Sequence, residues 1–126
     1  MRWINDTVAE FGHSIGIPSM RLDESGNLRL NAEDGSNIGI IYINSLTPAE
    51  VVLYRAISLD YLTPDQFRKA LKLVDFRHPR HWQFQVGCSS KQLVLAIRFP
   101  ERAFIVSTLG EGLETLQELL ESIKNK

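Results

Sequence analysis

The apolar residues of this chain change their spacing several times, between the spacing of an amphipathic helix and the alternation of a strand. Helical spacing occurs at residues 4–15, from residue 64 and from residue 109, and strand-like stretches fill 20–58 and 82–99. The resulting order is helix, three strands, helix, two strands, helix. Because the strand connections are short, the sheet is expected to be antiparallel. We therefore predict an α+β fold, a twisted antiparallel sheet flanked by helices, with residues 1–126 as a single domain.

The first helix is predicted from one apolar stripe. The stripe consists of Ile4, Val8, Phe11 and Ile15. Gly16, followed by Pro18, predicts the end of this helix. Trp3 lies beside the stripe, and we expect it to be only partly covered.

Three strands are predicted next from alternating or β-branched residues. The stretches are Met20–Leu22 with Leu28–Ala32, Ile38–Ile43 and Glu50–Ser58, separated by turns at Asp23–Asn27, Glu33–Asn37 and Ser45–Ala49.

The second helix has the clearest start signal. Thr63 is the predicted N-cap, Pro64 fits the first helical position, and Gln66 completes a capping box. Its buried stripe is predicted as Phe67, Ala70, Leu71 and Val74. This helix must end before Pro79, because proline cannot continue it.

The last third of the chain predicts a hairpin and a final helix. The hairpin strands are Trp82–Val86 and Gln92–Phe99, with a turn at Gly87–Lys91, and the helix carries Leu109, Leu113, Leu116, Leu120 and Ile123. Thr108 and Glu111 resemble a second capping box that opens this helix. The stretch from Ala103 to Ser107 fits either a strand or a helix.

The charge and cysteine content argue against several classes of partner. There are 14 basic and 15 acidic residues, giving a net charge of −1, so no long-range attraction to nucleic acid or an anionic membrane is expected. The single cysteine, Cys88, excludes an internal disulfide and suits a reducing compartment. No apolar run is long enough to span a bilayer, and the first 15 residues do not read as a signal peptide. We expect a cytoplasmic protein.

The residues that could carry chemistry do not form a convincing site. His78, His81 and Cys88 are too few for a structural zinc site, and the basic stretch Arg77–Trp82 has no second basic patch beside it. No nucleophile motif or phosphate-binding loop occurs, and paired carboxylates fall in turns. We expect no catalytic residues, no metal and no cofactor.

Several strings then resemble a known family, the class I type III secretion chaperones. The strand Gln92–Pro100 (QLVLAIRFP) resembles a Leu-rich family strand that ends in Phe-Pro. The pair Trp3-Ile4, Phe11, the run Ile15–Pro18 and the tail from Glu101 to Leu120 resemble more specifically the SycN-type subunit of the gatekeeper (YopN-like) chaperone. The resemblance covers nearly the whole chain in order and length, although the net charge is less acidic than is common in the family.

The resemblance implies a dimeric chaperone that binds the N-terminal region of a secreted client in extended form and keeps it soluble and secretion-competent. It also implies a bacterial cytoplasmic location, with peripheral attachment to the secretion apparatus left open, and a homodimer or a heterodimer with a second small chaperone. The implied client-binding residues are Trp3, Val8, Phe11, Leu28 and Leu30, and the implied dimer interface is Leu71, Leu73, Val74, Phe76, Trp82 and Phe84. Ordinary core packing is the alternative role for each, and it is favoured for Val8, Phe11 and Leu71.

Two other classes of function stay open from the sequence. One is a regulatory adaptor that binds a folded partner through one compact patch. The other is a small enzyme or metalloprotein, which a bound metal or a deep polar pocket would support. The sequence favours the chaperone.

Overall fold

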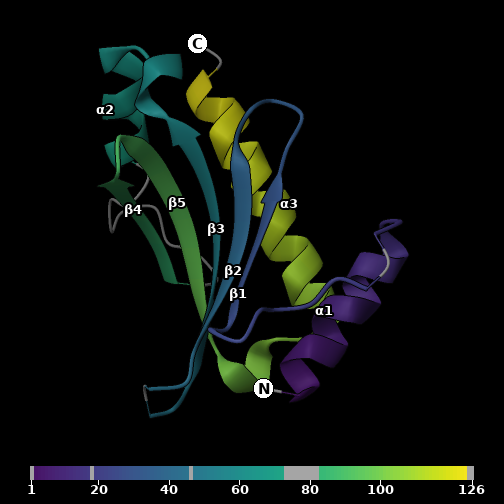
Figure 1. The fold of residues 1–126 in the computed structure, drawn as a ribbon. Helices are drawn as coiled ribbons and strands as arrows, with labels where there is room; N and C mark the ends of the chain where they lie inside the picture. Colours follow the sequence, from purple (N-terminus) through teal and green to yellow (C-terminus); the bar gives the residue numbers. More distant parts are fainter. Residues whose placement is uncertain (1, 18, 46, 73–82, 125–126) are drawn as a thin grey trace.

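The computed structural model describes residues 2–17, 19–45, 47–72 and 83–124 (Figure 1). Its helices are α1 (Arg2–Ser14), α2 (Pro64–Lys72) and α3 (Val106–Lys124), and its strands are β1 (Asn27–Asn31), β2 (Asn37–Ile43), β3 (Glu50–Ser58), β4 (Gln83–Ser89) and β5 (Gln92–Pro100). Two short 3₁₀ turns lie at Leu59–Tyr61 and Glu101–Ala103. The predicted α+β order is confirmed.

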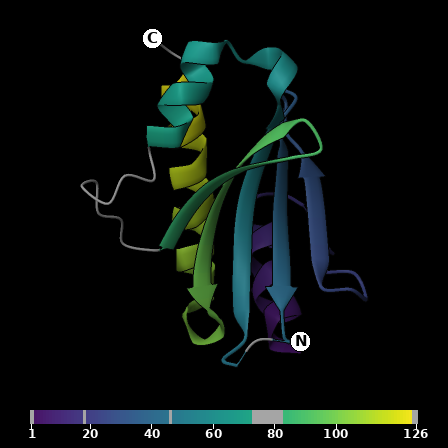
Figure 2. The same cartoon turned by 90° about the vertical axis from the view of Figure 1, so that its left-hand side faces the viewer.

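The five strands form one antiparallel sheet in the order β1-β2-β3-β5-β4 (Figure 2). The central strand is β3, in which Leu53 pairs with Ile40 of β2 and with Ile97 of β5. Strands β1 and β4 form the two edges of the sheet.

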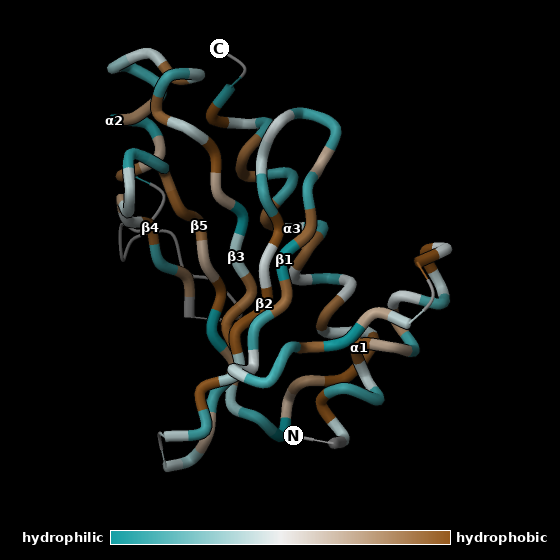
Figure 3. The backbone as a smooth tube through the Cα atoms, in the orientation of Figure 1, coloured by the Kyte–Doolittle hydropathy of each residue, from teal (hydrophilic) through white to brown (hydrophobic). Residues whose placement is uncertain are grey.

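The described helices gather on one face of the sheet (Figures 1 and 2). Helix α3 packs on β3 and β5, and Gly112 allows this approach, because a Cβ there would lie 2.7 Å from Leu53 Cδ1. Directly opposed residues share a face, and therefore the side chains of Leu28, Leu30, Ile40, Leu53, Ile97 and Phe84 face the helices. The other face carries Arg29, Gly39, Ile41, Tyr54, Ala96 and Arg98. In Figure 3, the brown segments of the strands mark the apolar residues of the sheet.

The end of α1 has the geometry of a Schellman motif. Gly16 has φ of +81°, the Ile17 N–H donates to the Gly12 carbonyl at 2.7 Å, and the Gly16 N–H donates to the His13 carbonyl. The predicted stop is therefore confirmed. The prediction for Ile15 was wrong: it follows the helix and is 50% exposed, whereas Ile4 and Val8 are buried.

The prediction of a strand at Met20–Leu22 was also wrong. Both side chains are buried, but this segment is a loop, and the Leu22 N–H donates to Asn5 Oδ1 at 2.8 Å. Alternation here comes from a loop that turns two side chains toward the core. The loop is thereby attached to α1.

The capping box of α2 is confirmed. The Thr63 N–H donates to Gln66 Oε1 at 2.8 Å, and the Gln66 N–H donates to Thr63 Oγ1 at 3.1 Å. Ala70 is buried, but Leu71 is 47% exposed, so the predicted stripe was wrong at Leu71. Val74 and the predicted helix end before Pro79 lie outside the described residues.

Two boundaries in the last third differ from prediction. Helix α3 begins at Val106, and Thr108 lies inside it, where Oγ1 accepts the Ile105 N–H at 3.0 Å, so Thr108 is not the N-cap. Strand β4 continues to Ser89, because Ser90 and Lys91, with φ of 50° and 64°, suffice for a tight turn.

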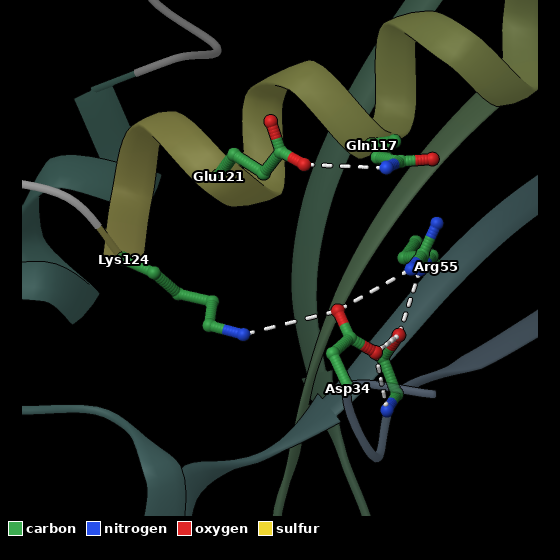
Figure 4. Close-up of polar contacts among 6 residues, drawn as sticks. Asp34, Arg55, Gln117, Glu121 and Lys124 are labelled. Carbon is green, nitrogen blue, oxygen red and sulfur yellow. Dashed lines mark hydrogen bonds and ion pairs between the residues drawn. The ribbon is translucent and has the colours of Figure 1, made fainter. Parts of the chain in front are cut away.

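A polar cluster joins the β1–β2 hairpin to the sheet and α3 (Figure 4). Arg55 of β3 is buried, and its Nε donates to Ser36 Oγ at 2.7 Å. Its Nη2 lies 3.3 Å from Asp34 Oδ2, and Lys124 Nζ of α3 lies 3.8 Å from the same oxygen. The cluster fixes the hairpin that contains the edge strand β1.

Candidate functional site

A groove of about 660 Å³ lies between β1 and the loop that precedes it. Its lining includes Leu22 of the loop, Leu28 and Arg29 of β1, and Asn5 of α1. A second groove, of about 540 Å³, runs beside α1 along Asp6 and Ala9.

The two grooves share residues and therefore adjoin. Asn5 and Arg21 line both. Asn5 Oδ1 accepts the Leu22 N–H, and this bond sets the distance between α1 and the loop. Together the grooves form a path from the side of α1 to the edge of the sheet, a shape that suits an extended segment better than a compact small molecule.

Strand β1 offers part of its outer backbone at the end of this path. Gly26 accepts from Tyr42 and Ala32 donates to Ser36, so the alternate residues Leu28 and Leu30 bond to β2. The backbone groups of Arg29 and Asn31 point outward at the sheet edge. An added strand is the common way to satisfy such groups.

The outward groups of Asn27 are already used. Its N–H donates to Asp23 Oδ1 at 2.9 Å, and its carbonyl accepts the Asp23 N–H at 2.8 Å. Asp23 Oδ1 also accepts the Ser25 N–H. This turn closes the first position of the edge and leaves the two after it open.

The charges around the groove are mixed. Arg21 and Arg29 are exposed cations, and Asp23 and Glu24 are exposed acids in the same wall. Within the described part of the chain, neither arginine makes an ion pair.

Trp3 lines a separate hollow, which shares no residue with the two grooves. This hollow, of about 410 Å³, is lined by Trp3, Pro48, Ala49, Pro100, Glu101 and Arg102. Trp3 Nε1 donates to Glu101 Oε1 at 3.3 Å, and the Tyr42 hydroxyl donates to Glu101 Oε2 at 2.8 Å. That hydrogen bond, with desolvation and the negative charge of Glu101, raises the pKa of Tyr42. Glu101 thus holds the exposed indole against the sheet.

The predicted client-binding residues occupy different environments. Trp3 is 38% exposed, as the sequence indicates, whereas Val8 is fully buried and Phe11 packs against the core. Leu28 and Leu30 are half-buried on the edge strand, and Leu28 lines the larger groove. Their assignment to client binding stays a prediction.

The predicted dimer interface is only partly visible. Leu71 is exposed at the end of α2, and Phe84 of β4 is half-buried against the core. Leu73, Val74, Phe76 and Trp82 lie outside the described residues. The assignment also stays a prediction.

The sequence did not single out the polar residues of the groove. Asn5, Arg21 and Arg29 look like ordinary solvated positions in helix, loop and strand. Only Asp23, in the predicted turn Asp23–Asn27, carried a signal, because Asp in that position commonly accepts backbone N–H groups.

No group of three or more His, Cys, Asp or Glu side chains within the described ranges could hold a metal ion. Cys88 is exposed on β4, and His78 and His81 lie outside those ranges. Among the described helices, none is long and apolar enough to cross a membrane.

Comparison with solved structures shows where this fold occurs. A chain of the ExsC–ExsE complex superposes with a TM-score of 0.80 at 20% identity, over 98% of this chain and 92% of that one. The Yersinia pestis type III secretion chaperone SycH, in complex with a fragment of YscM2, gives 0.71 at 13% identity, over 95% and 98%. The HopA1–SchA chaperone–effector complex gives 0.70 at 13%, over 96% and 92%. No protein-family profile and no curated protein sequence matches the chain. At these identities the likeness shows the fold, which is that of the type III secretion chaperones.

Proposed function

We propose that this chain is a class I type III secretion chaperone. It binds the N-terminal region of a secreted protein in extended form and keeps that protein soluble and secretion-competent. The observation that carries the proposal is the path of two adjoining grooves that ends at the open edge of β1. The fold, shared with structures of chaperones bound to their partners, supports it.

The finer assignments belong to the same proposal. The protein acts in the bacterial cytoplasm without catalysis or cofactor, and it forms a homodimer or a heterodimer with a second small chaperone. The resemblance of its two ends to the SycN-type subunit supports a gatekeeper of secretion as the client. The family resemblance supports a partner surface at α2, on which Leu71 is 47% exposed.

Site-specific photo-crosslinking in the native host tests the client. A benzophenone amino acid replaces Arg29 on the edge strand, and in a matched control it replaces Lys91, which is exposed in the turn at the opposite edge. We expect the benzophenone at position 29 to capture a secreted protein through its N-terminal segment. The benzophenone at position 91 should not capture that protein. Deleting the gene for this chain should then lower the amount of that protein in the culture medium.

The same experiment separates the chaperone from a regulatory adaptor. An adaptor would yield a partner that stays in the cell and is crosslinked within a folded domain. Equal capture of one protein at Arg29 and at Lys91 would contradict binding at the β1 edge.

A further inference from the structure

The residues of β1 present two different chemistries to an added strand. Leu28 and Leu30 face the helices. Arg29, between them, lies on the opposite face of the sheet, which we call its open side. A strand added at this edge continues the pleat, so its residue opposite Arg29 lies on the open side as well. Its two neighbours then fall beside Leu28 and Leu30. This holds for a parallel or an antiparallel strand.

The described strands place no unpaired acidic side chain on the sheet face that carries Arg29. Its partner across the ladder is Gly39, and the ring of Tyr54 lies over that glycine, with Cζ 1.9 Å from the position of an added Cβ. Glu50 is the one acidic residue that the described strands place on this face, and it is paired with Arg98 of β5. Arg29 therefore has no carboxylate from the described sheet.

The loop acids do not fill this role. Asp23 Oδ1 accepts the N–H groups of Ser25 and Asn27, and Glu24 makes no ion pair with Arg29 in the described structure. An opposed side chain on an added strand would have its Cβ about 4.5–5.5 Å from that of Arg29. An acidic side chain at that Cβ separation can form an ion pair with the Arg29 guanidinium.

On the face toward the helices, the same edge favours apolar side chains in an added strand. Leu28 lines the groove and is half-buried, and the buried Leu22 forms part of the same wall. A residue that enters beside Leu28 removes its remaining apolar surface from water. A polar residue there would lose solvation, and Asn5 Oδ1 in the same groove already accepts the Leu22 N–H.

We propose that the segment bound at β1 has an acidic residue between two apolar residues, with the carboxylate opposite Arg29. This inference rests on the proposed function and names the chemistry of its client segment. It concerns a short stretch only, because Asp23 closes the position of Asn27.

The test uses three nine-residue peptides that differ only at the central residue, which is Glu, Gln or Lys between two valines. Each is titrated into the full-length chain, and binding is followed by the amide NMR shifts of β1. An opposite-charge pair across strands is worth enough for the Glu peptide to bind about two- to fivefold tighter than the Gln peptide. The Lys peptide should bind weakest.

Charge reversal provides the specific control. Arg29→Glu should invert the order, so that the Lys peptide binds best. Arg21→Glu makes the same change of net charge in the same groove but away from the ladder, and it should keep the Glu peptide first. If Arg29→Glu fails to fold, Arg29→Gln should remove the preference.

The outcomes separate the inference from the function beneath it. Shifts at β1 with no dependence on the central residue, or the same order in Arg29→Glu, would overturn the acidic preference and leave strand addition standing. No shift at β1 with any of the peptides would overturn both. An equal response to Arg21→Glu and Arg29→Glu would show a general field effect and overturn the pairing.

Discussion

Arg55 illustrates what a single buried charge requires of its neighbours. Its side chain is 8% exposed, while that of Asp34 is 32% exposed. Ser36 joins the two, because its hydroxyl accepts from Arg55 Nε and donates to Asp34 Oδ1. Removing one member of such a group leaves a charge without its partner, which costs more than the intact pair contributes.

Replacing Asp34 by alanine should therefore destabilise the chain. We expect the free energy of unfolding to fall by about 1–3 kcal/mol, measured by urea denaturation. Asp65→Ala is the matched control, because Asp65 pairs with Arg68 on the surface of α2, where the side chains are 86% and 70% exposed. That change should stay within about 0.5 kcal/mol. Equal losses would show that burial of Arg55 does not matter.

The same carboxylate predicts a pH dependence. Desolvation raises the pKa of Asp34, but hydrogen bonds from Ser36 and the charges of Arg55 and Lys124 together bring it below the ordinary 3.8. A pKa lowered by folding adds stability above the unfolded value, and this is lost as the pH falls through the folded value. The stability gap between wild type and Asp34→Asn should be constant near neutral pH and shrink below 3.8. A gap that persists until acid unfolding would contradict this.

Two helical glycines make a second comparison. In Gly12, an added Cβ would lie 2.6 Å from the Ile17 carbonyl oxygen, whereas in Gly110 the nearest atom is Phe11 Cε1 at 3.5 Å. Gly12→Ala should destabilise by about 1–3 kcal/mol through overpacking. Gly110→Ala should stabilise by up to about 1 kcal/mol, because alanine favours helix. Thermal and urea unfolding of both variants would measure this, and a stable Gly12→Ala would contradict the close approach.

At the scale of the element, sequence prediction worked where the signals are local. The capping box at Thr63 and Gln66, the αL glycine Gly16 and the bounds of β3 all depend on neighbours in the chain. The start of α3 was wrong because Thr108 Oγ1 accepts the Ile105 N–H from inside the helix. A threonine can accept a backbone N–H either as the N-cap or from within the first turn of a helix. The sequence does not distinguish these two positions.

Helix α2 carries the prediction about assembly. Leu71 is exposed, and its helix contacts α3 and β4. If α2 forms the dimer interface, Leu71→Asp should convert a dimer of about twice 14.3 kDa into a monomer, because it would bury an unpaired charge. Light scattering after size exclusion measures the mass. Lys72→Asp is the control, because it changes the net charge by two units instead of one at the neighbouring exposed position. Circular dichroism would verify that both variants fold. A dimer that survives Leu71→Asp would place the interface elsewhere.

At the scale of the whole molecule, the fold could be predicted but the groove could not. The element order follows from periodicity, and short connections imply antiparallel pairing. The groove instead depends on a loop that returns to α1 through the Leu22–Asn5 hydrogen bond, between residues far apart in the chain. In the folded chain, Asn5, Arg21 and Arg29 line one groove.

Trp3 offers a test that involves the molecule and its client together. The indole is exposed and donates to Glu101, in a hollow that shares no lining residue with the β1 groove. If the client also wraps around α1, Trp3→Ala should weaken client binding by about tenfold, as expected for an aromatic anchor, and leave the oligomeric mass unchanged. A pull-down titration with the free client, once crosslinking has identified it, measures this affinity. Unchanged affinity would confine the client to the β1 side.

The Asp23 turn has a further consequence, for the solubility of the free protein. An open sheet edge invites a second copy to pair with it and to grow into an aggregate. Here the turn shortens the open edge to Arg29 and Asn31. Two copies that met antiparallel about Arg29 would set two guanidinium groups against each other, which is unfavourable. Repulsion between the two Arg29 side chains therefore disfavours pairing of β1 with a second copy of the chain. A client strand with an acidic residue at that position would not meet this repulsion.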